Sequence, residues 1–275
     1  MTKISLQMVF LGAAALALCL ISAMAAPWNA ASPDRTLTVY ASASIVNSLG
    51  PVAVAFRRTA GVKVTIKPGT AAELASHFAA GVPAHVLLLD DAPVLEEMAA
   101  KGFLDKASIG PVVAAPLILA APAERMFKAE VRRGFDLSHV VKGKIVVVAP
   151  TAGAEGRATK EALERLGWLD GLKPRLITVP DGRSAAQLVD RGGADAAILY
   201  ACDLAYSMGL EKVAEFPADL APPVTFSAAL CKGAPPSAGQ FLAFMREPLA
   251  QGYLKNAGFI PLPAAKPLQA AEKLP

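Results

Sequence analysis

The sequence predicts an α/β protein of two lobes, with a ligand site in the cleft between them. Short apolar runs, typical of buried strands, alternate along the chain with segments whose apolar residues recur at helical spacing. The expected strands are too many for a single sheet, so we expect two sheets. Hydrophobic residues make up 54% of the 275 residues and charged residues 18%, which excludes a disordered chain. The net charge of +4 is too small to indicate a nucleic-acid-binding protein.

Residues 1–25 have the pattern of a secretory signal peptide. Lys3 is followed by an apolar run from Met8 to Ile21 and then by Ala23-Met24-Ala25, a small-residue cleavage site. The run is short for a membrane-spanning helix, which needs about 20 apolar residues, although a retained N-terminal anchor is the alternative. We therefore expect export to the periplasm. That oxidising compartment permits a disulfide between Cys202 and Cys231, although two separate buried thiols are the simpler interpretation.

Strands and helices alternate regularly in the first half of the exported chain. Leu37–Ala41 has the composition of a buried strand, and the apolar residues of 44–58 recur at the spacing of an amphipathic helix. A glycine follows each expected helix, a position where a left-handed residue commonly ends a helix. The other elements expected here are strands at 62–66 and 86–89 and helices at 71–80 and 93–101.

The same alternation continues in the second half, with a looser stretch between residues 120 and 144. Strands are expected at 117–120, 144–148, 175–179, 196–200, 212–216 and 224–230, and helices at 156–166, 183–191, 236–246 and 248–256. Alternation of this kind implies parallel sheets that are covered by helices on both faces.

Four strand–helix junctions carry small residues and hydroxyl groups where a ligand would meet the start of a helix. They span residues 40–47, 67–74, 149–157 and 180–184. Backbone N–H groups at a helix start are unpaired and lie at the positive end of the helix dipole, so they favour an anion. Ser44 is the first candidate donor, although capping its own helix is the commoner use of such a serine. Thr70 could likewise cap its helix or donate to a ligand.

Four segments resemble the molybdate-binding proteins of ABC importers. They are LTVYASASIVNSL at 37–49, GVPAHVLLLDD at 81–91, KEALERLG at 160–167 and AILYACDLA at 197–205, in matching order over residues 36–260. The resemblance implies the two-lobed type II periplasmic binding protein fold, with a first lobe from residues 26–117 and 219–262, a second from 118–218, and a loose tail at 263–275. It also implies a monomer that passes molybdate, tungstate or a similar oxyanion to a permease in the inner membrane, without a cofactor or a resident metal ion.

The resemblance assigns ligand roles to individual positions. The family holds a tetrahedral dianion with uncharged donors, namely two serine hydroxyls, backbone amides and a tyrosine hydroxyl. Ser44 matches the first serine and Tyr200 the tyrosine, while Gly182 replaces a valine and keeps its backbone N–H. Five or so hydrogen bonds to a charged ligand, at about 1.5–3 kcal/mol each, would supply roughly 8–15 kcal/mol before the costs of binding.

Two positions depart from the family pattern. The second ligand serine falls on Ala71, which has no hydroxyl, so Thr70 would have to replace it. Glu155 stands where the family has a small alanine, and a carboxylate there would repel a dianion. Arg157 or Arg183 could offset this charge, or Glu155 and Arg157 could face solvent. A binding protein of the same fold for another small anion, or for a cation held by Glu155, is therefore the alternative function.

The sequence lacks the signatures of catalysis. A serine hydrolase using Ser44 would need a base beside it, but His77, His85 and His139 lie in unrelated parts of the chain. Neither a Gly-x-Ser-x-Gly turn nor a His-x-x-x-His pair occurs. We therefore expect no enzyme activity and no catalytic residue, and we predict that His85 is structural.

Overall fold

The structure is a computed structural model that describes residues 36–262. The expected signal peptide over residues 1–25 and the expected tail over residues 263–275 lie outside the described residues. Between residues 36 and 262, no helix combines the length and the apolar character that a membrane crossing requires.

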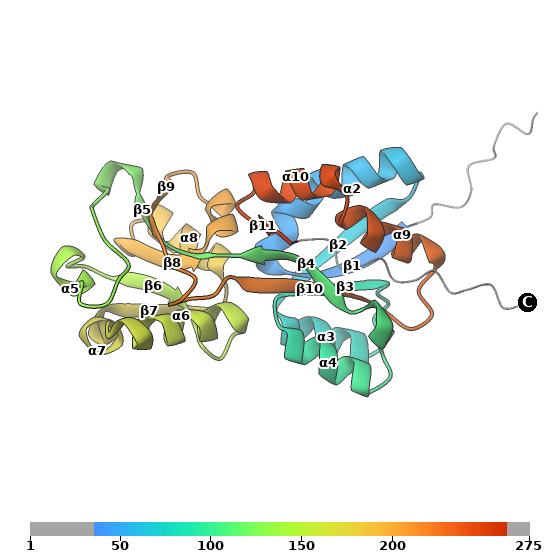
Figure 1. The fold of residues 1–275 in the computed structure, drawn as a ribbon, viewed down its shortest axis with the longest axis horizontal. Coiled ribbons are helices and arrows are strands. Elements are labelled where there is room, and N and C mark those ends of the chain that lie inside the picture. The colour runs from blue at the N-terminus through green and yellow to red at the C-terminus, as the bar shows by residue number, and fades with distance from the viewer. Residues whose placement is uncertain (1–35, 263–275) are drawn as a thin grey trace, which may run out of the picture. The chain divides into compact units, whose positions relative to one another are not determined.

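The first sheet has six strands in the order β11-β4-β10-β3-β1-β2 (Figure 1). They are β1 (Thr36–Ser42), β2 (Lys63–Gly69), β3 (Val86–Leu89), β4 (Gly110–Ala115), β10 (Val224–Leu230) and β11 (Ile260–Pro261). β1 is parallel to β2 and β3, whereas β10 is antiparallel to β3 and β4. Every residue of β3 is buried, because alternate side chains pack into clusters on opposite faces of the sheet.

The second sheet has five strands in the order β7-β6-β8-β5-β9. They are β5 (Leu117–Pro122), β6 (Ile145–Val148), β7 (Leu176–Val179), β8 (Ala196–Tyr200) and β9 (Leu210–Glu215). β6 is parallel to β7 and β8, and β5 is antiparallel to β8 and β9. Ile198 and Leu199 of β8 pack into different clusters, so this sheet is also buried on both faces.

Helices cover both faces of each sheet (Figure 1). On the first sheet, α2 (Val46–Ala60), α9 (Pro236–Met245) and α10 (Pro248–Asn256) lie on one face, with α3 (Ala71–Ala79) and α4 (Ala92–Ala100) on the other. On the second sheet, α6 (Ala154–Leu166) and α7 (Leu169–Leu172) lie opposite α8 (Gly182–Asp190). The shorter elements are α5 (Leu137–Val140), η1 (Ala43–Ile45), η2 (Lys106–Ser108), η3 (Ala123–Arg125), η4 (Lys173–Arg175) and η5 (Ala201–Tyr206).

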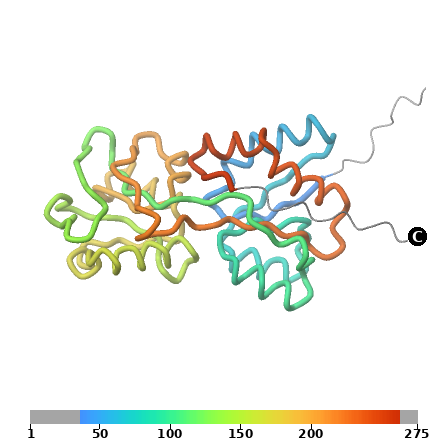
Figure 2. The backbone as a smooth tube through the Cα atoms, viewed as in Figure 1, coloured from blue at the N-terminus to red at the C-terminus, as the bar shows by residue number. Residues whose placement is uncertain are grey.

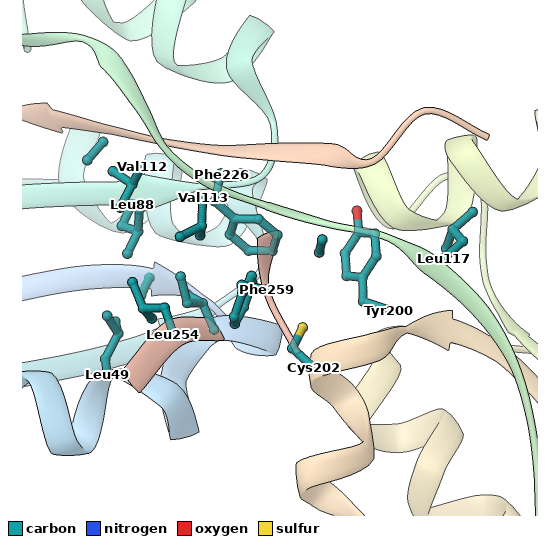
Figure 3. Packing of buried hydrophobic residues seen from close by; sticks show 14 of the residues in the cluster. Leu49, Leu88, Val112, Val113, Leu117, Tyr200, Cys202, Phe226, Leu254 and Phe259 are labelled. Atoms are coloured by element: carbon teal, nitrogen blue, oxygen red, sulfur yellow. The ribbon is translucent and has the colours of Figure 1, made fainter. Parts of the chain in front are cut away.

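The chain passes between the two sheets twice, and the two segments run alongside each other (Figures 1 and 2). The first passage, from β4 to β5, is made at Pro116, and the second, from β9 to β10, takes residues 216–223. Beside these passages the ring of Tyr200 meets the edge of Phe226, with centroids 5.8 Å apart (Figure 3). We call the first sheet with its helices the first lobe (36–115 and 224–262), and the second sheet with its helices the second lobe (117–215).

The sheets are mixed, which corrects the expectation of parallel sheets. β5 and β10 enter their sheets directly from a passage between the lobes, without an intervening helix, and both pair antiparallel. Strand β4 is absent from the sequence-based prediction for the same reason: only Pro116 separates it from β5, so no alternation with a helix marks it.

The two cysteines of the described chain are free and buried. Cys202 packs in the cluster that contains Tyr200 (Figure 3), whereas Cys231 packs with the side chains on the other face of the first sheet. The interpretation of two separate thiols is therefore the correct one. His85 is structural as predicted, since its Nδ1 accepts a hydrogen bond from the Thr38 amide at 2.8 Å.

Candidate functional site

A small cavity lined by both polar and apolar residues lies where strands of both lobes end. Its volume is about 30 Å³, and its lining comes from the ends of β1, β2, β6 and β7, the residue after β3 and the start of α6. The lining residues are Ser42, Ala43, Ser44, Gly69, Thr70, Ala71, Asp90, Val148, Ala152, Gly153, Glu155, Pro180 and Asp181. A cavity needs about 10–15 Å³ to hold one water molecule, so this one suits a ligand of few atoms.

Ser44 belongs to the first-lobe wall of the cavity. It is buried in the 3-10 turn η1, and its Oγ lies 3.5 Å from Oε2 of Glu155 on the second lobe. The expectation that Ser44 stands at the helix N-cap is wrong, because the 3-10 turn intervenes and the N-cap of α2 is Ile45. The Ser44 hydroxyl is therefore available to the cavity.

Thr70 and Ala71 lie on the same wall, but neither offers a hydroxyl proton to a ligand. Thr70 caps α3 in a capping box: its Oγ1 accepts from the Glu73 amide at 3.2 Å, and its amide donates to Glu73 Oε2 at 2.9 Å. The Thr70 hydroxyl donates to the same Glu73 oxygen at 3.0 Å. The structure thus gives Thr70 the capping role, and it leaves Ala71 as a buried residue at the cavity wall.

Glu155 dominates the second-lobe wall. It sits in the first turn of α6, only 4% exposed, and its Oε1 accepts a hydrogen bond from the Tyr200 amide at 3.2 Å. The alternative that Glu155 faces solvent is therefore excluded. The alternative of compensation by an arginine is also excluded, since Arg157 pairs with Asp91 at 2.8 Å and Arg183 stacks on the Tyr206 ring.

Gly182 lies beside the Glu155 carboxyl group, and its lack of a side chain leaves room for that group. A Cβ at position 182 would come within 2.9 Å of Glu155 Oε1 and 2.1 Å of Asp203 Oδ2. The absence of a side chain at position 182 therefore leaves room for both carboxyl groups, Asp203 first and Glu155 second.

Tyr200 reaches the site indirectly. Its side chain is buried in the core, and its hydroxyl donates to Asp90 Oδ2 at 3.4 Å, while Asp90 itself lines the cavity. Its amide holds Glu155, which Ser44 meets from the other lobe. Ser44 and Tyr200 therefore converge on one carboxyl group. Burial and the nearby Asp90 raise the pKa of the Tyr200 hydroxyl well above its usual value, so it is present as a neutral donor.

Three carboxyl groups at the site were not among the residues that sequence reasoning selected. Asp90 accepts from the Ser42 hydroxyl at 2.6 Å, and Asp181 caps α8 by accepting from the Ser184 amide at 2.7 Å. Asp203 is fully buried, and neither of its carboxyl oxygens has a hydrogen-bond partner among the described residues. The signal that could have found Asp90 is its place directly after the fully buried strand β3.

The carboxyl groups disfavour one another's charge. Burial, together with Asp203 and Asp90, raises the pKa of Glu155 well above its usual value. Burial raises the pKa of Asp203 to about 7, and it also raises the pKa of Asp90. Among residues 36–262, no group of three or more His, Cys, Asp or Glu side chains is arranged to hold a metal ion.

Polar contacts join the two lobes around the cavity. Besides the Ser44–Glu155 and Tyr200–Asp90 contacts, the Tyr206 hydroxyl donates to the carbonyl of Ala43. The Arg157–Asp91 ion pair adds a fourth contact. These bonds hold the two walls against each other in the structure.

Comparison with known proteins places this geometry in context. The sequence model of a family described as bacterial extracellular solute-binding protein matches residues 37–260. The molybdate-binding protein ModA of Escherichia coli is 29% identical over 239 residues, covering 84% of this chain and 91% of the relative. ModA of Haemophilus influenzae is 27% identical over 226 residues, covering 81% and 89%. The structure of the periplasmic molybdate-binding protein of Azotobacter vinelandii superposes with a TM-score of 0.67 at 22% identity, covering 82% of this chain and 99% of that one.

Proposed function

The chain belongs to the family of bacterial extracellular solute-binding proteins, and on this premise we propose that it is the periplasmic binding protein of an ABC importer. Its ligand is molybdate, tungstate or a similar oxyanion, which it passes unchanged to a permease in the inner membrane. The names of the two ModA relatives, each covered over most of its length, support this ligand class. Residues 1–25 would direct export, and closure of the lobes would enclose the ligand.

One observation carries the proposal: Ser44 of the first lobe lines a small cavity between the strand ends and meets Glu155 of the second lobe there, and the Tyr200 amide holds this same carboxyl group. Such a cavity encloses a ligand of few atoms. The first N–H groups of α6 have no partner within the helix and lie at the positive end of its dipole, beside the cavity. Uncharged donors and a helix start together favour a small anion. In the bound state we assign ligand contacts to Ser44, Glu155 and the amide of Gly182.

A cation held by Glu155 is the second candidate, because Asp90, Asp181 and Asp203 lie near this carboxyl group without a cationic partner for it within residues 36–262, although no three of these groups are arranged to hold a metal ion. Ionised carboxylates without a cationic partner attract positive charge. The two candidates differ in what they require of Glu155, since an oxyanion requires the neutral form and a cation requires the ionised form.

A ligand screen separates the candidates. The melting temperature and the heat of titration are measured with molybdate, tungstate and sulfate, and then with magnesium, calcium and manganese as chlorides. We expect molybdate or tungstate to raise the melting temperature, because a ligand that binds only the folded state stabilises it. If every oxyanion gives no heat and no shift while one divalent cation gives both, the oxyanion function is wrong.

A further inference from the structure

The cavity carries negative groups without a positive one to balance them. Glu155 faces Asp90 from the loop after β3, Asp181 from the N-cap of α8, and Asp203 from η5. Tyr200 and Cys202 also face it, and neither is cationic. In the described part of the chain, no arginine or lysine forms an ion pair with Glu155. A dianion cannot enter such a cavity favourably unless a proton neutralises part of this charge.

The hydrogen bonds identify which carboxyl group is free to carry that proton. Asp90 accepts from hydroxyl groups on both oxygens, from Ser42 and from Tyr200. Asp181 accepts from the Ser184 amide at 2.7 Å as the N-cap of α8. Both groups are therefore occupied as acceptors.

Glu155 is placed differently. Its Oε1 accepts from the Tyr200 amide at 3.2 Å, while Oε2 accepts only the Ser44 hydroxyl at 3.5 Å, the longest of these hydrogen bonds. A proton on Oε2 therefore displaces only this weak contact, and the Ser44 hydroxyl can turn to the ligand. A protonated carboxyl group is uncharged and has one O–H donor. It is thus the same kind of ligand contact as a serine hydroxyl, the group that Ala71 lacks. Asp203, buried next to Glu155 and Gly182 with both oxygens unpartnered, adds a second unbalanced carboxyl that disfavours ionisation of Glu155.

Resting on the proposed function, we propose that Glu155 binds the oxyanion as a protonated donor, so that capture of a fully ionised oxyanion is coupled to uptake of one proton. The proton is taken from solvent, joins Oε2 of Glu155 and is shared in a hydrogen bond with a ligand oxygen; no covalent bond of the ligand changes. Burial raises the pKa of Glu155, which supports the neutral form. At low pH the group is already protonated and affinity is independent of pH; above its pKa, affinity falls by up to about tenfold per pH unit.

Titration calorimetry tests the coupling. The purified protein is titrated with molybdate and with tungstate from pH 6 to pH 9, in pairs of buffers whose ionisation enthalpies differ, which gives the number of protons taken up. These oxyanions carry no proton in this range, so any uptake belongs to the protein. We expect uptake to approach one proton at the upper end of the range, with the affinity falling there.

Substitutions at position 155 show whether Glu155 donates a hydrogen bond to the oxyanion or only ceases to repel it when it is protonated. Glu155→Gln keeps a neutral N–H donor, so its affinity should hold within a few-fold from pH 6 to pH 9 and exceed that of the unmodified protein by about 10-fold or more at pH 9. Glu155→Ala has no donor and should bind more weakly than the glutamine variant at every pH. Glu161→Gln, on the exposed side of the same helix, is the matched control and should behave as the unmodified protein.

The outcomes distinguish the inference from the function on which it rests. Tight oxyanion binding without proton uptake and without pH dependence would overturn the inference and leave the function standing. The inference also fails, and the function again stands, if Glu155→Ala binds as tightly as Glu155→Gln, because the carboxyl would then only repel. If neither the unmodified protein nor either variant binds an oxyanion at any pH, while all three show cooperative thermal unfolding, the proposed function itself fails.

Discussion

The two walls of the cavity differ in whether their polar groups have hydrogen-bond partners. On the first-lobe wall, Ser42 is paired with Asp90 and Thr70 with Glu73, so these polar groups have partners inside the lobe. On the second-lobe wall, Glu155 and Asp203 are buried without a cation, and Asp203 has no hydrogen-bond partner at all among the described residues. A satisfied polar group stabilises its own lobe, whereas an unsatisfied one lowers stability until something enters the site. This contrast indicates that the first wall supports the fold and the second is set up for a ligand or a proton.

The largest effect should follow from removing the acid at Asp203. Its pKa is raised from 3.8 to about 7, so the folded state binds a proton that the unfolded state has lost between these pH values. Stability therefore falls as pH rises through this window and levels off above it. From pH 5 to pH 8 we expect Asp203 to contribute a loss on the order of 3 kcal/mol, and Asp203→Asn should remove this part. Urea unfolding at both pH values measures the difference.

Asp195 provides the control for this prediction, because it is a partly exposed aspartate paired with Arg125 at 3.0 Å and accepting from the Lys144 amide at 2.9 Å. Asp195→Asn should leave the pH dependence of the free energy of unfolding as it is, since exposed ion pairs contribute little. If Asp203→Asn retains the full loss of stability between pH 5 and pH 8, Asp203 is not the source of that loss. The buried carboxyl group of the second wall would then cost the protein no stability, and in this respect the two walls would not differ.

The next largest effect should come from crowding the second wall. A Cβ at position 182 would lie 2.1 Å from Asp203 Oδ2 and 2.9 Å from Glu155 Oε1. Gly182→Ala should therefore lower the free energy of unfolding by about 2 kcal/mol, in the range typical of overpacking. Adding Glu155→Ala should recover part of this loss, and a double-mutant cycle by urea unfolding measures the coupling.

Gly252 is the matched position for that experiment. It lies in α10 with no atom within 4 Å of its added Cβ, so Gly252→Ala should stabilise the protein by about 0.5–1 kcal/mol through helix propensity. If the free-energy losses of Glu155→Ala and Gly182→Ala add up in the double mutant, the side chain at position 155 and the space at position 182 are energetically independent.

Much of the fold could be predicted from the sequence, because the segments with an apolar pattern are the ones that the structure buries. Strand β3 coincides with the predicted strand at 86–89, since a short apolar run between a loop with a glycine and a proline and a following helix has few alternatives. The helix expected from residue 44 starts instead at Val46, because the 3-10 turn η1 gives no separate sequence signal. Strand β4 could not be predicted in this way, because no helix separates it from β5.

The candidate site was predictable only in part. Ser44 and Glu155 were accessible to sequence reasoning because they stand at helix starts, where backbone groups are exposed to a ligand. The burial of Glu155 and its approach to Asp203 were not, since they depend on how η5 packs against α8 after both lobes are built. The sequence does not distinguish an aspartate that caps a helix from one whose oxygens have no hydrogen-bond partner. Asp181 is of the first kind and Asp203, among the described residues, of the second.

A smaller effect should follow from removing the Ser44 hydroxyl of the first wall. Ser44→Ala removes a hydroxyl that lies 3.5 Å from Glu155 Oε2, too far for a strong bond in the ligand-free protein. The melting temperature should therefore change little. Binding of the oxyanion should weaken by about tenfold or more, because a hydrogen bond to a charged ligand contributes about 1.5–3 kcal/mol. Calorimetry at pH 6, the lower end of the range, measures this loss, and unchanged affinity would remove Ser44 from the ligand set.

The smallest effect is expected at Thr70, which lines the same cavity but belongs to the capping box of α3. Thr70→Val keeps the shape of the side chain and removes the hydroxyl, so the free energy of unfolding should fall by about 1 kcal/mol. Affinity should stay within about twofold, because the hydroxyl proton already serves Glu73 and never reached the ligand. Thr70→Ser, which keeps the cap, should restore stability. The opposite result, a tenfold weaker affinity with an unchanged melting temperature, would make Thr70 a second ligand hydroxyl on the first-lobe wall, beside Ser44.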